Sequence, residues 1–283
     1  MDDPSDFDLH RIPSMAPPPG RPSAPPAGRW IAVATLIVAT GGAFYLAFAW
    51  RPRPPAVETT AAPVAKAKET PLSLGGKSEP TTLPPLDASD ALVRTLVQAL
   101  SESPAVMAWL PTKGLIRNFT VVVTNIADGA TPAKHLRALR PSAPFRTIEG
   151  NGHVFVDPRG YGRYSTIADA VASVDPAAAA RLYATLKPRI EEANRELGSP
   201  DASFDRTLER ALVALLDTPI VTDAIRLKPK GIGYAFADDR LESLTAAQRQ
   251  LLRMGPRNVR IVRDRLLKIA LALGISSGHL PKE

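Results

Sequence analysis

The pattern of apolar and polar positions divides the chain into distinct kinds of segment. From residue 86 onward, apolar residues recur at three- and four-residue steps, which is the spacing of helices with one buried face. Residues 30–50 instead form one uninterrupted apolar run, and short alternating runs occur at two places further along. Most of the remaining sequence before residue 86 is rich in proline and alanine. We therefore expect one globular region, preceded by an apolar segment and by stretches too poor in apolar residues to fold.

The globular region contains several segments with helical spacing, many of them preceded by a residue type that caps helices. One long segment contains Pro188, which we expect to kink or divide its helix near Leu186, because proline removes a backbone hydrogen bond. The expected helices begin beside Ser89, Pro104, Thr112, Thr131-Pro132, Asp175-Pro176, Phe204, Thr245 and Pro256.

Two short pairs of alternating segments predict β-hairpins. Phe145–Ile148 and His153–Val156 flank a glycine-containing turn, and Ile225–Leu227 and Gly233–Phe236 flank a second one. Helices still account for most of the globular pattern. The fold class we expect is mainly α: a multi-helix globular domain with one or two small β-hairpins, preceded by a single transmembrane helix and a Pro-rich linker.

The apolar residues 30–50 predict a membrane-spanning helix. The run carries no charge and has Trp30 and Trp50 at its ends, where tryptophan suits the headgroup boundary. At ~1.5 Å per residue, its length matches a hydrocarbon core of ~30 Å. A cleaved signal peptide is the alternative, because Ala47 and Ala49 have the spacing of a cleavage site. The long, acidic, proline-rich leader is unusual for such a signal, so we expect a retained anchor in the lipid bilayer.

The expected organisation follows from these segments. Basic residues flank the apolar run on both sides, so the positive-inside rule does not decide the orientation. A proline-rich spacer after a single anchor is common in proteins that project into the periplasm. We expect a disordered cytoplasmic tail at 1–29, a transmembrane helix at 30–50, a Pro/Ala-rich linker at 51–85 and a helical globular domain at 86–283.

Composition removes several kinds of chemistry. The chain has no cysteine, which excludes disulfides, thiolate metal sites and a cysteine nucleophile. Of the four histidines, His10 and His279 lie near the two ends of the chain, and His135 and His153 do not form a close ligand pair. We therefore predict no catalytic residue, no metal site and no cofactor.

Asp238, Asp239 and Glu242 form the densest carboxylate cluster. They stand at the start of a predicted helix, where acidic side chains complement the helix dipole. The alternative is a hydrolase of the cell envelope, which would need these carboxylates to line a cleft with free oxygens.

The arginine-rich stretch 253–265 predicts an exposed helix face. Its helical spacing places Arg257, Arg260 and Lys268 opposite the apolar side of the helix. Contact with anionic headgroups or nucleic acid is the alternative; nucleic acid is disfavoured because no aromatic residue stands among these arginines to stack on bases. Arg253 and Asn258 flank the turn at Gly255-Pro256 between the last two predicted helices, and we expect them to bond backbone groups there.

Tyr161, Arg163 and Tyr164 follow the first hairpin. The candidate binding surface has two parts, these three residues and the basic helix residues Arg257, Arg260 and Lys268. Exposed tyrosine and arginine are favoured at binding surfaces. The alternative is a tyrosine packed on the next helix with its hydroxyl hydrogen-bonded.

Several segments resemble one bacterial family, the domain of unknown function 3014. They are Asp238–Asn258, Leu83–Asp87, Gly162–Tyr164 and Leu197–Asp205. The resemblance covers roughly residues 80 to 272 and implies an amino-terminal transmembrane helix, a proline-rich spacer and a periplasmic domain. No catalytic residue is established for that family, so none is carried over. We expect an inner-membrane protein whose periplasmic domain is a non-enzymatic binding or scaffold module for an envelope protein or a cell-wall partner. A domain that faces the cytoplasm remains the alternative.

Overall fold

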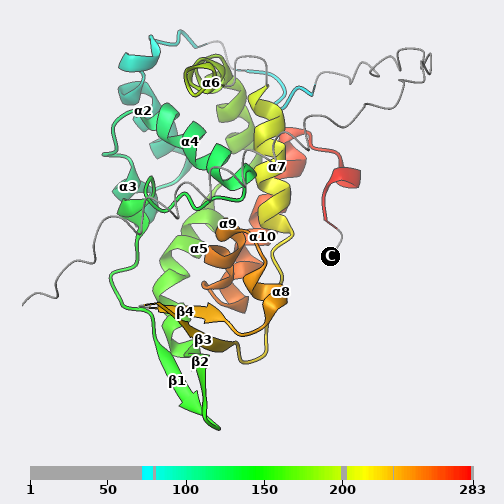
Figure 1. The fold of residues 1–283 in the computed structure, drawn as a ribbon. Helices are drawn as coiled ribbons and strands as arrows, with labels where there is room; N and C mark the ends of the chain where they lie inside the picture. The colour runs from blue at the N-terminus through cyan, green and yellow to red at the C-terminus, as the bar shows by residue number, and fades with distance from the viewer. Residues whose placement is uncertain (1–71, 79–80, 199–202, 232, 282–283) are drawn as a thin grey trace, which may run out of the picture. The chain divides into compact units, whose positions relative to one another are not determined.

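The fold is drawn from a computed structural model in which part of the chain is described (Figure 1). The predicted tail 1–29 and the predicted transmembrane helix 30–50 lie outside that part. Within it, no helix is both long enough and apolar enough to cross a membrane. The described residues are 72–78, 81–198, 203–231 and 233–281.

Helices dominate these residues and a small antiparallel sheet accompanies them, as the sequence pattern predicts. The α-helices are α2 (Asp90–Leu100), α3 (Pro104–Trp109), α4 (Leu115–Ala127), α5 (Ser165–Ser173), α6 (Pro176–Glu196), α7 (Phe204–Leu216), α8 (Asp239–Glu242), α9 (Ala246–Leu252) and α10 (Pro256–Leu273). Short 3₁₀ helices are η1 (Leu86–Ala88), η2 (Arg137–Leu139), η3 (Pro158–Tyr164) and η4 (Ser277–His279). The strands are β1 (Thr147–Gly150), β2 (His153–Val156), β3 (Arg226–Lys230) and β4 (Gly233–Phe236).

The helices with clear apolar spacing have the predicted bounds. The periodicity predicts helices over Phe204–Leu216 and Pro256–Leu273, and α7 and α10 have these bounds. In α6, the carboxylate of Asp175 accepts a hydrogen bond from the N–H of Ala178 at 2.7 Å, which caps the helix. The helix continues across Pro188, so the predicted division is wrong. Buried side chains on both sides of the proline, Leu186 and Ile190, hold the two turns against one core.

Two helix starts differ from the expected capping. Ser89 does not cap α2, because its hydroxyl donates to the carbonyl of Leu86 at 2.7 Å. The first residue of α2, Asp90, instead accepts from the N–H groups of Gly114 and Leu115 at 2.9 and 2.8 Å. A side chain of one helix therefore satisfies the free amides at the start of α4.

The helix expected after Thr131-Pro132 is absent. The hydroxyl of Thr131 accepts from the N–H of Ala133 at 3.3 Å, which closes a local turn in place of a helix cap. Pro141 and Pro144 further prevent helix formation. Residues 128–146 form a long connection between α4 and β1 that contains only the 3₁₀ turn η2.

Both predicted hairpins form, and they join into one sheet. In the part of the chain described, the strand order is β1-β2-β3-β4, and every neighbouring pair is antiparallel. The junction pairs Val154 with Leu227 in the centre of the sheet. The first turn contains Asn151 and Gly152 with φ of 51° and 73°, which matches the twist of a tight hairpin.

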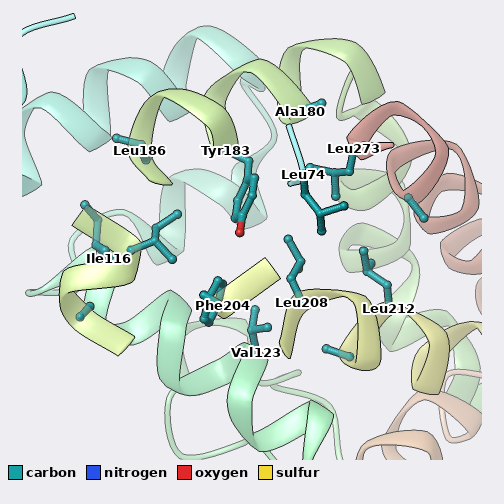
Figure 2. Packing of buried hydrophobic residues seen from close by; sticks show 14 of the residues in the cluster. Leu74, Ile116, Val123, Ala180, Tyr183, Leu186, Phe204, Leu208, Leu212 and Leu273 are labelled. Atoms are coloured by element: carbon teal, nitrogen blue, oxygen red, sulfur yellow. The ribbon is translucent and has the colours of Figure 1, made fainter. Parts of the chain in front are cut away.

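A core formed by α2, α4, α6, α7 and the end of α10 contains the largest group of buried side chains. Figure 2 shows Leu74 among side chains of α6, α7 and α10. Leu74 is 1% exposed, and the N–H of Gly75 donates to the carbonyl of Leu273 at 2.9 Å. Leu74 and Gly75, which the sequence assigns to the linker, therefore pack on the helices.

One buried carboxylate fixes this segment to the core. Asp205, which is 1% exposed, accepts from the N–H of Leu74 at 3.1 Å and from the hydroxyl of Tyr183 at 2.6 Å. The ammonium of Lys187 lies 2.5 Å from the same carboxylate. Burial and the adjacent carboxylate both raise the pKa of Tyr183, so its hydroxyl stays a neutral donor.

Candidate functional site

A groove of about 1370 Å³ lies beside the outer strand β4. Its walls come from the connection between α4 and β1, from η3, from β4 and from the end of α9. Basic side chains line it, and none of the residues that line it is acidic. These basic residues are Lys134, Arg137, Arg140, Arg163 and Arg253.

The groove also has an apolar floor. Leu227 and Phe236 come from the packed face of the sheet, and Met254 follows α9; all three are buried. Phe145 and Tyr234 stand at the rim with 39% and 41% of their surface exposed, and their rings pack on each other with centroids 6.5 Å apart. A concave surface with apolar residues and converging polar groups is the usual form of a binding site.

Arg163 is the most constrained basic residue of the groove. Its guanidinium carbon lies 4.8 Å from the ring centroid of Tyr164 and 5.3 Å from that of Phe145, within the range of cation–π attraction. One terminal nitrogen lies 3.3 Å from the hydroxyl of Tyr164. Its Nε is buried without a hydrogen-bond partner among the described residues. The side chain is therefore held in place by aromatic rings, and no carboxylate in the described part of the chain forms a salt bridge with it.

The turn between α9 and α10 fixes the wall that carries these residues. Gly255 has φ of 82°, and a Cβ at this position would lie 2.3 Å from the Tyr161 ring, so only glycine allows this contact. The amide nitrogen of Asn258 donates to the carbonyls of Met254 and Tyr161 at 2.9 and 3.1 Å. Two segments that carry the family resemblance, Gly162–Tyr164 and the turn at Gly255, thus meet and form one side of the groove.

The structure separates the two parts of the candidate binding surface. Arg163 and Tyr164 line the groove, whereas Tyr161 is packed under the turn and burial raises its pKa. Tyr164 follows the alternative interpretation, because it is buried and its hydroxyl accepts from the side chain of Gln250 at 3.3 Å. The Tyr161 ring is packed as well, against Gly255. Outside the groove lining, on the exposed face of α10, lie Arg257, Arg260 and Lys268.

The expectation for the turn residues is confirmed for one of them. Asn258 bonds backbone carbonyls, as described above. Arg253 instead donates to the side chain of Gln250 at 3.4 Å and lines the groove. Other arginines of the stretch have structural contacts: Arg263 donates to the carbonyl of Thr218 at 3.1 Å, and Arg265 to that of Val174 at 3.0 Å.

The carboxylate cluster has the geometry of helix capping and ion pairing. Asp238 caps α8 and bonds the backbone and guanidinium of Arg240, whose hydrogen bonds lower the pKa of Asp238. Glu242 accepts from Lys230 at 2.9 Å and from the N–H of Phe236 at 3.1 Å, and the lysine contributes most to lowering the pKa of Glu242.

Asp239 is exposed and pairs with Lys228 at 3.1 Å. None of the three carboxylates lines the groove. This geometry argues against the hydrolase interpretation, which requires free oxygens in a cleft.

Elsewhere in the described part of the chain, a histidine meets a carboxylate where His279 Nδ1 lies 2.8 Å from Glu209 Oε1. No set of three His, Cys, Asp or Glu side chains there is arranged to hold a metal ion. His135 and His153, the two histidines considered from sequence, belong to no such set.

Sequence reasoning missed most of the groove. The sequence predicts a helix start at Thr131-Pro132, just before Lys134, and it predicts only strands at Phe145 and Tyr234. One signal was present: residues 129–147 contain basic residues but no aspartate or glutamate.

Comparisons with known proteins identify a family. No curated protein and no solved structure matches the chain. A family model described as "Protein of unknown function (DUF3014)" matches residues 115–270, a range that contains every residue of the groove lining. Because this match spans more than half of the sequence, the chain belongs to the DUF3014 family of proteins of unknown function.

Proposed function

We propose that this protein is a single-pass protein of the bacterial inner membrane whose globular region binds a partner in the periplasm. The length and lack of charge of residues 30–50 support the anchor, and the tryptophans at both ends support its position in the bilayer. In this proposal residues 1–29 stay in the cytoplasm. The partner is a protein of the envelope or a component of the cell wall.

The groove is the observation that carries the binding function. It is concave, it has an apolar floor, and its basic side chains are not neutralised by acidic neighbours in the lining. The aromatic residues Phe145 and Tyr234 stand exposed at its rim. Such a surface supports recognition, and the carboxylates that a hydrolase would use are occupied elsewhere.

A reporter fusion tests the location. A reporter enzyme that is active only outside the cytoplasm, fused to the carboxyl end, should show activity in intact cells. Activity confined to a cytoplasmic reporter at the same position would refute the periplasmic location. It would favour the alternative in which Arg257, Arg260 and Lys268 meet anionic headgroups or nucleic acid.

Crosslinking in intact cells tests the groove. A photoreactive amino acid in place of Tyr234 should capture a partner, and the capture should be lost when Arg163→Gln is added. The control position is Leu271, which is exposed on α10 outside the groove lining. Arg257→Gln, outside the lining, should leave capture at Tyr234 unchanged. Equal capture at Tyr234 and at Leu271 would refute the binding function of the groove. Capture at Tyr234 that does not change with Arg163→Gln would refute it as well.

A further inference from the structure

We propose that the groove binds an acidic peptide segment in an extended conformation, with carboxylates paired to Arg163 and Arg253 and an apolar side chain on the floor. This inference rests on the proposed function and names the class of ligand that the groove takes. It depends on the charge of the lining, on the fixed position of Arg163 and on the free edge of β4.

Within the part of the chain that the structure describes, the cations of the groove have no ion-pair partner. Among the described residues, no salt bridge involves any of the five basic side chains of the lining. Asp157, a buried carboxylate next to η3, is already paired with Arg159 at 3.0 Å and Arg146 at 3.3 Å. Carboxylates of a ligand would therefore meet cations without internal competitors, which is charge complementarity at a concave surface.

Arg163 is preorganised for a planar anion. The rings of Phe145 and Tyr164 restrict its guanidinium, so little side-chain freedom is lost on binding. A guanidinium can bind both oxygens of one carboxylate in parallel, which a lysine cannot. Arg253, which donates a long hydrogen bond of 3.4 Å to Gln250, is the second cation on the same wall.

The outer edge of the sheet favours a peptide. β4 is the last strand of the sheet, and its ladder with β3 has the N–H of Ala237 bonded to the carbonyl of Arg226 at 2.9 Å. Because bonded and non-bonded pairs alternate in an antiparallel ladder, the N–H and C=O of Tyr234 point away from β3. The N–H of Phe236, which points the same way, is occupied by Glu242. Tyr234 therefore offers a donor and an acceptor to an extended backbone beside the basic wall.

Two other anionic partners fit less well. Single-stranded nucleic acid needs open aromatic faces, but Phe145 packs against Tyr234 and Arg163, and Tyr164 is buried. A membrane surface is planar, whereas these cations converge on a groove with an apolar floor. The acidic peptide satisfies both the charge and the shape.

The test uses the full chain in a mild detergent and a fluorescein-labelled peptide of about eight residues in which Asp and Glu alternate with Leu and Phe. Fluorescence anisotropy should show binding that weakens as salt rises from about 0.05 M to about 0.5 M. The same peptide with Asn and Gln in place of its acidic residues should not bind. Arg163→Gln should weaken binding roughly tenfold, and Arg163→Lys should weaken it less.

Matched variants keep the test decisive. Arg257→Gln with Arg260→Gln removes two positive charges outside the groove and should leave binding unchanged. If circular dichroism shows that the Arg163→Gln variant does not fold, Arg253→Gln alone should still weaken binding of the peptide. An equal effect of the groove and α10 variants would show that only net charge matters, and would overturn the inference.

Competitors separate the other ligand classes. Tighter binding of a ten-nucleotide oligo(dT), or of dihexanoyl phosphatidylglycerol, than of the acidic peptide would overturn the inference in favour of that class. If the peptide does not bind but crosslinking from Tyr234 in cells still depends on Arg163, the ligand class is wrong and the binding function stands. If crosslinking from Tyr234 also fails, the ligand class and the binding function of the groove are both refuted.

Discussion

Replacing Asp205 by asparagine tests how the helical core holds residues 72–78. The carboxylate accepts hydrogen bonds from Tyr183 and Leu74 and pairs with Lys187. Asparagine keeps the shape and one acceptor oxygen, but it removes the charge and leaves the ammonium of Lys187 without its partner. Removing one member of a fully buried pair costs about 3–5 kcal/mol.

The exposure of Lys187 places the expected loss at the lower end of this range. Its side chain is 25% exposed, so water partly solvates the ammonium that is left. We expect the free energy of unfolding to fall by about 3 kcal/mol, since Asp205 also loses part of its hydrogen bonding. For a domain of this size, this corresponds to a decrease in Tm of roughly 6–12 °C.

The assay is thermal and urea unfolding of the full chain, followed by circular dichroism. Lys187→Met combined with Asp205→Asn should recover part of the loss, because no unpaired charge is then left in the core. Trypsin should also cleave after Lys77 sooner in the Asp205 variant, since the N–H of Leu74 loses its charged acceptor. A loss below about 1 kcal/mol, or strict additivity of the two substitutions, would refute the reasoning.

Three further predictions concern the turn at the groove and the acid stability of the fold. Gly255→Ala should lower the free energy of unfolding by more than 2 kcal/mol, because its Cβ would overlap the Tyr161 ring; Gly274→Ala, with positive φ but open space around it, should cost only about 1 kcal/mol. Equal thermal shifts in the two variants would contradict this. Asn258→Ala should cost about 1–3 kcal/mol in urea unfolding, because two carbonyls lose their donor; an unchanged midpoint would count against it. The pKa of Glu242 is lowered mainly by its lysine partner, so its stabilisation is present above its ordinary value of 4.5 and is lost as the pH falls through the folded value. Glu242→Gln should therefore unfold with a smaller loss of stability between about pH 5 and pH 3, and an unchanged pH dependence would argue against this assignment.

The sequence predicts those parts of the fold in which local signals and burial agree. α10 begins at Pro256 after a glycine, and its apolar residues keep one face over its whole length, so both ends follow from the chain itself. The same holds for the hairpin at Asn151 and Gly152, where the turn sets the register. The pairing of Val154 with Leu227 depends on strands far apart in sequence, and no local pattern contains that information.

The candidate site was harder to predict because tertiary contacts form it. Arg163 and Tyr164 were identified as polar-aromatic neighbours, but the cation–π contact with Phe145 depends on how the long connection before β1 folds. Thr131 and the following proline have the form of a helix start, yet the hydroxyl serves a turn. The sequence therefore does not indicate that the basic residues of that connection line a groove with β4, which depends on the tertiary fold.

The length of α10 separates the point where the incoming chain contacts the domain from the groove. The carbonyl of Leu273 receives the incoming chain at Gly75, whereas Met254, just before the other end of the helix, lies in the groove lining. Eighteen residues at ~1.5 Å each put about 27 Å between these points. In the proposed arrangement, the chain from the membrane would thus join the domain near one end of α10, and a partner in the groove would bind near the other end.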